Sequence, residues 1–296
     1  MGTGFKLLPP IQGVVHMKVM KLAALAAAGL VAMAVSAAAA DKIGNCEVTG
    51  KKGSFPIEKP AKAGQFTVET NLPGPVWWNG DTPETIKDGM EYCMAAEIAW
   101  RAGYDKLVVV NTDWDPLIAG QTHDFDVAFS QISITDERKK VHDFSVPYFN
   151  SDIGVLARAD APVDANSIKK VKVGVQQSTT GMTFATDKLG LTNTQVYPDQ
   201  GSMFAALTAK QIDAAITDTS IVLAQEIESK NKNKVVGQYQ TGETYGGIYQ
   251  KGNPNNPIID KIITSMKDDG TIKKLSEKYL AASWGKDPAS VPVWKP

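Results

Sequence analysis

The chain has 296 residues, and its 31 Lys and Arg against 32 Asp and Glu give a formal net charge of −1. A chain of this length is long for one hydrophobic core and suits two compact lobes. The balanced charge argues against a polyanionic partner, and no segment clusters Lys and Arg with aromatic residues as nucleic-acid binding would require.

The first forty residues have the features of a secretory signal peptide. They contain no acidic residue, and Lys18 and Lys21 precede an apolar run over residues 22–35. Small residues follow the run up to Ala40, after which we expect cleavage. The run is too short and too rich in alanine for a membrane span. We therefore expect residues 1–40 to be removed on export to the periplasm.

Residues 1–16 are unusually polar for the start of such a signal, so we expect translation to begin at Met17 or Met20. No cysteine directly follows the apolar run, because Cys46 lies several residues beyond Ala40. A soluble periplasmic protein is therefore favoured over a lipid-anchored one. Removal of residues 1–40 leaves 28 Lys and Arg against 32 Asp and Glu, a net charge of −4.

Residues 41–64 are rich in Lys, Gly and Pro, which predicts an irregular N-terminal extension. The two cysteines, Cys46 and Cys93, would enter an oxidising compartment. A disulfide that ties the extension to the first helix is the favoured interpretation, and two unrelated buried thiols are the alternative. A metal site is poorly supported because His123 and His142 lie near no cysteine in the sequence, and we expect no cofactor.

Strands and helices alternate from residue 66 onward. Residues 66–70 begin the first strand, and apolar residues from Met90 to Ile98 recur at helical spacing before a stop at Gly103. Further elements are a strand at 107–110, a helix from about Asp115, a strand at 125–130, and then strands at 171–175 and 212–217, helices at 180–189, 203–209 and 220–229, a last strand at 245–251 and two final helices. This alternation predicts mostly parallel sheets covered by helices.

Arg138 stands out because it breaks a local rule. Thr135 reads as the N-cap of a helix, which puts Arg138 near the third helical position, where a cation opposes the macrodipole. If the guanidinium turns back toward the preceding strand, its planar fork would fit a carboxylate. The alternative is a surface arginine paired with Asp136 or Asp143.

Two further candidates lie where a predicted strand gives way to a helix. Residues 177–181, Gln-Ser-Thr-Thr-Gly, offer hydroxyl and amide groups at a helix start, which suits an anion but is also ordinary capping. Asp218 ends a strand, where it either caps the next helix or points into the crevice where α/β sheets bind ligands. Arg138 and Asp218 together would match the two charges of a free amino acid.

The stretch 126–138, together with Phe144-Ser-Val-Pro-Tyr148, resembles the diagnostic segment of family 3 solute-binding proteins, the periplasmic amino-acid receptors of ABC importers. The resemblance covers residues from about 66 to 284. It implies an α/β fold of the type II periplasmic-binding-protein kind, with two lobes, each a mostly parallel sheet flanked by helices, and a two-stranded hinge. Residues 65–151 and 245–296 would form lobe 1 and residues 152–244 lobe 2, with crossings near 149–153 and 240–246.

The resemblance also assigns roles in a ligand site. Arg138 with Thr179 and Thr180 would hold the ligand carboxylate, Asp218 the ammonium, and Ser133 would assist. Trp114 would form an apolar wall, with a core position as its less favoured alternative, and Trp77 or Trp78 could line the mouth or equally be core. The neighbouring pocket residues would be Ser130, Gln131, Ile132 and Asn71.

One departure from the family bears on the ligand. Receptors for basic amino acids carry an aspartate and an aromatic residue where this chain has Asn71 and Gly74, so we expect an uncharged ligand side chain. Glu69, Asp81 or Glu91 would have to substitute for the missing acid if the ligand were cationic.

The resemblance implies a monomeric binding protein that takes up a free amino acid between its lobes and delivers it to an ABC permease. It implies no enzymatic activity. Two alternatives remain open at this point, a periplasmic dehydratase-like enzyme of the same fold and a sensor or scavenging protein that reports to another receptor.

Overall fold

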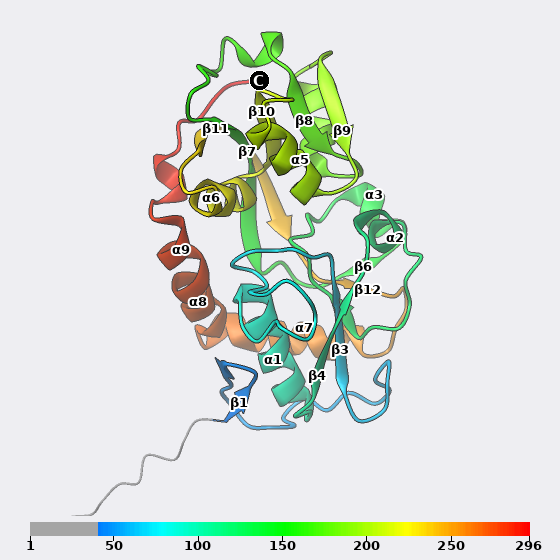
Figure 1. The fold of residues 1–296 in the computed structure, drawn as a ribbon. Helices are drawn as coiled ribbons and strands as arrows, with labels where there is room; N and C mark the ends of the chain where they lie inside the picture. The colour runs from blue at the N-terminus through cyan, green and yellow to red at the C-terminus, as the bar shows by residue number, and fades with distance from the viewer. Residues whose placement is uncertain (1–40) are drawn as a thin grey trace, which may run out of the picture. The chain divides into compact units, whose positions relative to one another are not determined.

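The computed structural model describes residues 41–296, so the predicted signal peptide and the predicted start codon lie outside the described residues. The described part contains two five-stranded sheets, each accompanied by helices, and a small two-stranded sheet near its start (Figure 1). Within this part, no helix combines the length and the apolar character that a membrane crossing demands.

The first sheet has the strand order β4-β3-β5-β12-β6. β3 lies parallel to β4 and β5, whereas β12 pairs antiparallel with β5 and β6. Four of the five strands therefore run in the same direction, as the prediction of a mostly parallel sheet required, and only β12, a strand from late in the chain, runs against them. The strands are β3 (Phe66–Thr70), β4 (Leu107–Asn111), β5 (Val127–Ala128), β6 (Asp143–Phe144) and β12 (Ile248–Tyr249).

The second sheet has the order β11-β7-β10-β8-β9 and is also mixed. β8 lies parallel to β9 and β10, and the two long strands β7 and β11 form an antiparallel edge beside β10. The strands are β7 (Phe149–Arg158), β8 (Val173–Gln176), β9 (Thr194–Tyr197), β10 (Ala214–Asp218) and β11 (Asn233–Tyr245).

Most predicted helices are present with small shifts of their ends. α1 ends at Gly103, whose backbone φ of 104° requires a residue without a side chain, as the sequence indicated. π-helical turns over Phe184–Lys188 and Glu277–Ala281 continue α4 and α8. The helices are α1 (Met90–Ala102), α2 (Trp114–Ile118), α3 (Asp136–Lys139), α4 (Thr180–Thr183), α5 (Gln200–Thr208), α6 (Thr219–Glu228), α7 (Asn256–Asp268), α8 (Thr271–Ser276) and α9 (Ala282–Trp284).

The start of β7 and the end of β11 connect the two sheets. Phe149 pairs with Tyr245 and Ser151 with Glu243, and the register is irregular between Tyr239 and Glu243. The segments predicted to cross between lobes, 149–153 and 240–246, thus lie at the start of β7 and the end of β11, which pair with each other. Regular pairing weakens where the register shifts, which is where a hinge would bend most easily.

The C-terminal tail does not stay with the first sheet, as the predicted lobe boundary 245–296 required. Val293 bridges to Gln238 of β11, and the Trp294 amide donates to the Gln238 carbonyl at 2.8 Å. The Trp294 ring packs on Gly237, where a Cβ atom would lie 2.1 Å from the ring. A tryptophan therefore buries its face on the second sheet because a glycine leaves room for it.

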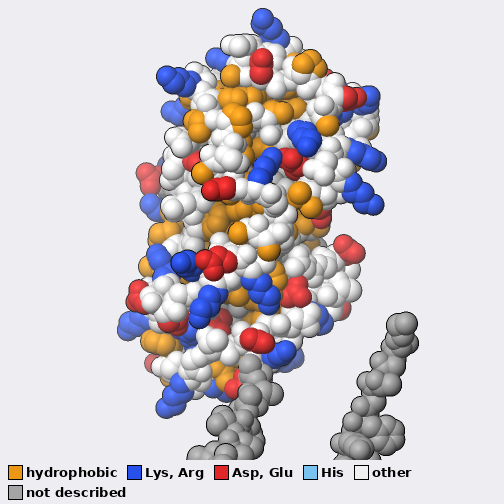
Figure 2. Space-filling model, turned by 90° about the vertical axis from the view of Figure 1, so that its left-hand side faces the viewer, with side chains coloured by type: hydrophobic (Ala, Val, Ile, Leu, Met, Phe, Trp, Pro, Cys, Tyr) orange, Lys and Arg blue, Asp and Glu red, His pale blue; other side chains and the backbone are white. Residues whose placement is uncertain are grey.

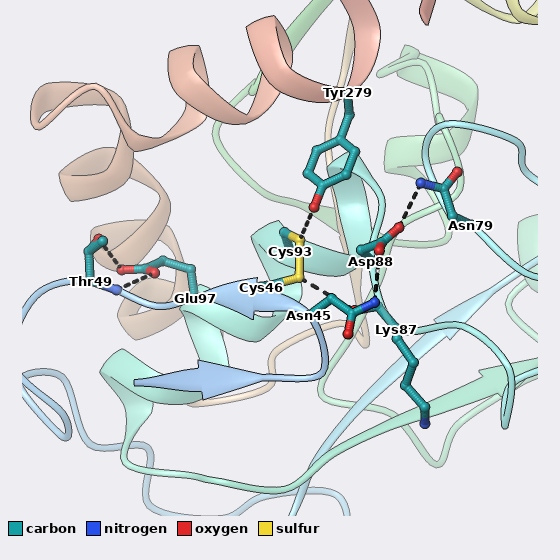
Figure 3. Close-up of a disulfide and its surroundings, with 9 residues drawn as sticks. All are labelled: Asn45, Cys46, Thr49, Asn79, Lys87, Asp88, Cys93, Glu97 and Tyr279. Carbon is teal, nitrogen blue, oxygen red and sulfur yellow. Dashed lines mark hydrogen bonds between the residues drawn. A yellow bond between two sulfur atoms is a disulfide. The ribbon is translucent and has the colours of Figure 1, made fainter. Parts of the chain in front are cut away.

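The N-terminal extension is more ordered than its composition predicted. Its strands β1 (Lys42–Ile43) and β2 (Cys46–Glu47) form an antiparallel pair, and the structure joins Cys46 to Cys93 of α1 in the favoured disulfide. Figure 3 shows the Tyr279 hydroxyl beside this bond, 3.1 Å from the Cys93 sulfur. The Glu97 carboxylate accepts from the Thr49 amide and hydroxyl at 2.8 and 2.9 Å, so α1 holds the extension through a covalent and a polar contact.

Replacing both cysteines by serine should lower the free energy of unfolding by roughly 3–4 kcal/mol, because the bond closes a loop over a sequence separation of 47 residues in the unfolded chain. Urea unfolding of the variant and the parent, both without reductant, measures the difference. A double variant as stable as the parent would contradict the prediction, as would two titratable thiols in the unfolded, unreduced parent.

Candidate functional site

A pocket lies between the carboxyl ends of strands from both sheets, the edge at which α/β proteins bind ligands. The segments that follow β3 and β5 line one side, and the segments that follow β8 and β10 line the other. It contains about 530 Å³ of space not occupied by atoms. The lining residues are Asn71, Leu72, Pro73, Trp114, Ser130, Gln131, Ser133, Arg138, Thr179, Thr180, Asp199, Gln200, Gly201, Thr217, Asp218 and Ile221.

Arg138 turns back from α3 into this pocket. The Thr135 hydroxyl caps the helix by accepting from the Arg138 amide at 3.2 Å, and the guanidinium donates from Nη1 to the Ser133 carbonyl at 2.8 Å. Asp136 and Asp143 instead pair with lysines, so the surface-arginine alternative is wrong. The side chain is 8% exposed, and burial lowers the pKa of Arg138 to about 10. A buried cation in this position favours an anionic ligand.

Arg138 and Trp114 meet the same backbone oxygen across the pocket. Arg138 Nη2 donates to the Ser178 carbonyl at 3.1 Å, and Trp114 Nε1 donates to it at 3.3 Å. The guanidinium carbon lies 5.3 Å from the centre of the Trp114 ring, a cation–π distance. Ser178 follows β8, so these contacts join side chains from the first half of the chain to the loop before α4.

Asp218 occupies the N-cap position of α6, yet its side chain makes no capping hydrogen bond. The Tyr245 hydroxyl donates to its carboxylate instead, and the same hydroxyl lies 2.9 Å from Ser220 Oγ and 3.1 Å from Ser151 Oγ. Burial raises the pKa of Asp218 to about 7, with a further contribution from the negative charge of Glu243. The capping alternative is therefore wrong, and the carboxylate is free to meet a ligand.

Thr179 fits both interpretations of the loop before α4, a helix cap and a wall of the ligand pocket. Its hydroxyl accepts from the Met182 amide at 3.1 Å, which caps the helix, and donates to the Gln176 carbonyl at 2.7 Å. It also lines the pocket beside the half-buried Thr180. Since the Thr179 hydroxyl already has two partners, the backbone amides of this turn are the better donors to an anion.

Gln131 is held in position by a carboxylate behind it. Its backbone amide and its Nε2 group donate to Glu91 at 2.9 and 2.6 Å, so its Oε1 atom remains available toward the pocket. Glu91 is fully buried and also accepts from Trp78 Nε1 at 2.7 Å and from the Tyr148 hydroxyl. The burial of Glu91 raises the pKa of its carboxyl group.

Three other predicted pocket residues also have defined positions. Asn71 lines the pocket, donating from its backbone amide to Ser130 Oγ at 3.2 Å and from Nδ2 to the Thr112 carbonyl at 2.8 Å. Ser133 is almost fully buried and bridges to Tyr245. These contacts tie the end of the first strand to the loop after β5.

Several predicted positions lie elsewhere. Trp78 is fully buried against Tyr92 and does not line the pocket, because its indole N–H is committed to Glu91. Ile132 is likewise fully buried and not part of the lining.

The acidic residues considered as substitutes do not line the pocket either. Glu69 accepts from the Thr122 hydroxyl at 2.7 Å, Asp81 is exposed, and Glu91 lies behind Gln131. Within residues 41–296, no cluster of His, Cys, Asp or Glu could hold a metal ion.

The sequence did not reveal every pocket residue. Leu72, Pro73, Gln200, Gly201, Thr217 and Ile221 line it without a recognisable signal. Asp199 carries the pattern already noted at Thr179 and Asp218, a polar residue between a strand and a helix, and its carboxylate caps α5 by accepting from the Ser202 amide at 2.7 Å. The same pattern would therefore have predicted Asp199 as a pocket residue.

The two mixed sheets, the crossing strands and the pocket between strand ends define a two-lobed α/β protein of the type II periplasmic-binding-protein class. The chain belongs to the bacterial extracellular solute-binding proteins of family 3, whose sequence model matches residues 75–282. The predicted family and fold class are confirmed.

Relatives of known activity are mostly amino-acid-binding proteins. The L-cystine-binding protein TcyJ of Escherichia coli K12 is 29% identical over 199 residues, 66% of this chain and 74% of that one. An ancestral arginine-binding protein, solved with bound glutamine, is 30% identical with a TM-score of 0.66, over 74% of this chain and 98% of that one. An ancestral amino-acid-binding protein described as a precursor of cyclohexadienyl dehydratase is 28% identical with a TM-score of 0.63, over 73% and 95%.

Proposed function

We infer that the protein is the periplasmic substrate-binding protein of an ABC importer, which binds one free amino acid and delivers it to a membrane permease. The observation that carries this inference is the pair Arg138 and Asp218. They have opposite charges, they are 8% and 5% exposed, and they line one pocket from different sheets. A zwitterion satisfies both charges at once, which neither a simple anion nor a simple cation does.

The hydrogen-bond donors and acceptors that line the pocket indicate how an amino acid would bind. The ligand carboxylate would receive the remaining N–H groups of Arg138 and amides at the start of α4, and the ammonium would donate to Asp218 and to Gln131 Oε1. Because these groups come from both sides of the pocket, a ligand contacts all of them only when the lobes are closed. Its binding energy therefore favours the closed state over the open one.

The proposed function also includes three further points: the protein acts in the periplasm, it is a monomer, and its partner is a membrane permease. Figure 2 shows Lys and Arg side chains intermingled with those of Asp and Glu on the face turned to the viewer. A surface of mixed sign suits a protein that diffuses freely between encounters and does not adhere to a polyanion.

Neutral amino acids should bind more tightly than lysine or arginine. The pocket lining has two carboxylates, Asp218, which would pair with the α-ammonium, and Asp199, which caps a helix, so a positive charge on the ligand side chain would lack a dedicated partner. Thermal shifts with each of the twenty amino acids test this, since a ligand that binds only the folded state raises its melting temperature. The largest shift with lysine or arginine would contradict the preference. No shift with any amino acid would overturn the proposed function itself.

Binding should also weaken as the pH falls below about 7, by up to about tenfold per pH unit. The ligand ammonium requires ionised Asp218, whose pKa in the ligand-free protein is raised to about 7, so affinity is full above this pH and protons compete below it. Arg138, Glu243 and Tyr245 are the groups that act on Asp218. Calorimetry at several pH values measures the effect. In Glu243→Gln the loss should begin at lower pH, and an unchanged midpoint would contradict the assignment.

The second candidate function is enzymatic, of the dehydratase type. One observation favours it, since a buried carboxyl group with a pKa near neutrality, as in Asp218, is suited to act as a general acid. A turnover assay decides between the two functions. An amino acid recovered unchanged after prolonged incubation supports the binding protein, and its conversion supports the enzyme.

A further inference from the structure

A second and larger chamber adjoins the pocket that contains Arg138 and Asp218. It has about 1070 Å³ of space not occupied by atoms and opens to solvent. The two spaces are neighbours, since five residues line both of them, namely Pro73, Gln131, Gln200, Gly201 and Ile221. A ligand held in the first pocket therefore has the second space directly beside it.

Gly74 lines the second space next to Pro73, which lines both spaces. A Cβ atom at this position would lie 3.1 Å from Trp78 Cδ1 and 3.8 Å from both amide atoms of the Gln131 side chain. Trp78 cannot yield, since it is fully buried and bonded to Glu91. A side chain at position 74 would therefore press on Trp78, so the close contact at this wall of the chamber favours glycine.

The chamber walls are uncharged along most of their length. One wall is a face of α5 with Phe204, Ala205 and Thr208, and another is a face of α6 with Ile221 and Ala224. Phe204 and Ala205 lie four and three residues before Thr208, and Ile221 lies three before Ala224, so each set occupies one side of its helix. Pro73, Pro75 and Trp77 supply the opposite, apolar side.

A single acidic residue, Glu228, lies among the lining residues of the chamber, at the far end of α6. It follows Asp218 by ten positions along the helix, a distance of roughly 15 Å at 1.5 Å per residue. This distance separates the two backbone positions, so a charge on a ligand side chain would lie among the uncharged walls for most of the way to Glu228. A carboxylate on the ligand side chain would be repelled by the negative charge of Glu228 and by that of Asp81, whose charge also acts on Glu228.

We propose that this chamber receives the side chain of the bound amino acid, so that the ligand is an α-amino acid with a long, uncharged and predominantly apolar side chain. The proposal rests on the proposed function, because Arg138 and Asp218 must hold the α-carboxylate and α-ammonium at the chamber entrance. It adds the chemical class of the side chain and the residues that select it.

A series of straight-chain amino acids tests the proposal in the wild-type protein. The probes are L-alanine, L-norvaline, L-norleucine and L-2-aminooctanoic acid, titrated by calorimetry. Each methylene that enters an apolar chamber should lower the Kd about fourfold. Alanine that binds as tightly as the longer probes would overturn the proposal while leaving the proposed function intact. If none of the probes binds, the proposed function fails and the proposal fails with it.

Two variants that fill the chamber test whether the gain in affinity along the series arises there. Ala205→Trp and Thr208→Trp change exposed residues of α5 that line the chamber, so the fold should tolerate both. Either variant should bind alanine within twofold of wild type and lose the gain along the series. The control Ala282→Trp changes an exposed helical alanine outside both spaces and should keep that gain. A gain that persists in both α5 variants would overturn the assignment of the side chain to this chamber.

Discussion

Arg138→Ala should weaken amino-acid binding by roughly 5 kcal/mol, about 4,000-fold in Kd. Arg138 is 8% exposed and its guanidinium carbon lies 5.3 Å from the centre of the Trp114 ring, so a ligand carboxylate brought into this pocket loses most of its water. Without Arg138 the carboxylate would remain buried and without a charged partner, which costs more than the loss of one hydrogen bond. The effect should appear as faster dissociation of the ligand.

Calorimetry with the tightest-binding amino acid measures this change, and circular dichroism checks that the variant is folded. Lys139→Ala is the matched control, because Lys139 is the next residue of α3, is exposed and pairs only with Asp136 at the surface. It should bind like wild type. A folded Arg138→Ala protein with wild-type affinity would remove Arg138 from the site.

Asp218→Asn should weaken binding by roughly 4–5 kcal/mol, because the ligand ammonium would lose its buried counter-ion. The substitution preserves the size of the side chain and an acceptor for the Tyr245 hydroxyl, so the surrounding contacts should persist. The exposed control Asp187→Asn removes the same charge from the second half of the chain and should have no effect.

The sharper measurement for Asp218 compares an amino acid with its deaminated analogue. Wild-type protein should prefer the amino acid strongly, and Asp218→Asn should lose most of that preference since it no longer senses the ammonium. A variant that still discriminates between the two molecules would disprove the proposed role. Calorimetry with both molecules on both proteins provides the four affinities required.

The positions of Arg138 and Asp218 could be predicted because their local sequence carries the signal. Arg138 contradicts the helix dipole in the first turn of α3, and Asp218 is a polar residue at the end of a buried strand. Both features depend on a few neighbouring residues. The structure places both side chains at one pocket, and their roles as ligand partners stay predictions.

The position of Trp78 could not be predicted in the same way. Two adjacent tryptophans give no indication of which is buried, and the contact that decides it joins Trp78 to Glu91, thirteen residues away on α1. Glu91 was considered only as an acid that could face a cationic ligand, whereas Gln131 and Tyr148 converge on it from later segments. Burial of an acid depends on donors that only the tertiary structure brings together.

The order of the strands in the sheets could not be predicted from local sequence either. β12 has two residues and pairs with β5 and β6, which precede it by more than one hundred positions. Alternation of strands and helices predicts parallel neighbours, and nothing in a two-residue strand indicates that it will insert antiparallel between them. The prediction of mostly parallel sheets holds, and what the local sequence did not indicate is the one strand in each sheet, β12 and β7, that runs against its neighbours.

The attachment of Trp294 to Gly237 affects the degrees of freedom of the molecule. Two adjacent crossing strands, β7 and β11, allow one lobe both to swing and to twist relative to the other. The tail is a third connection, since it leaves α9 and ends on the second sheet, away from the strand junction at Phe149 and Tyr245. Three points of attachment resist torsion better than two, so we expect opening to be mainly a swing about a single axis, which would return the two halves of the ligand site to the same alignment at closure.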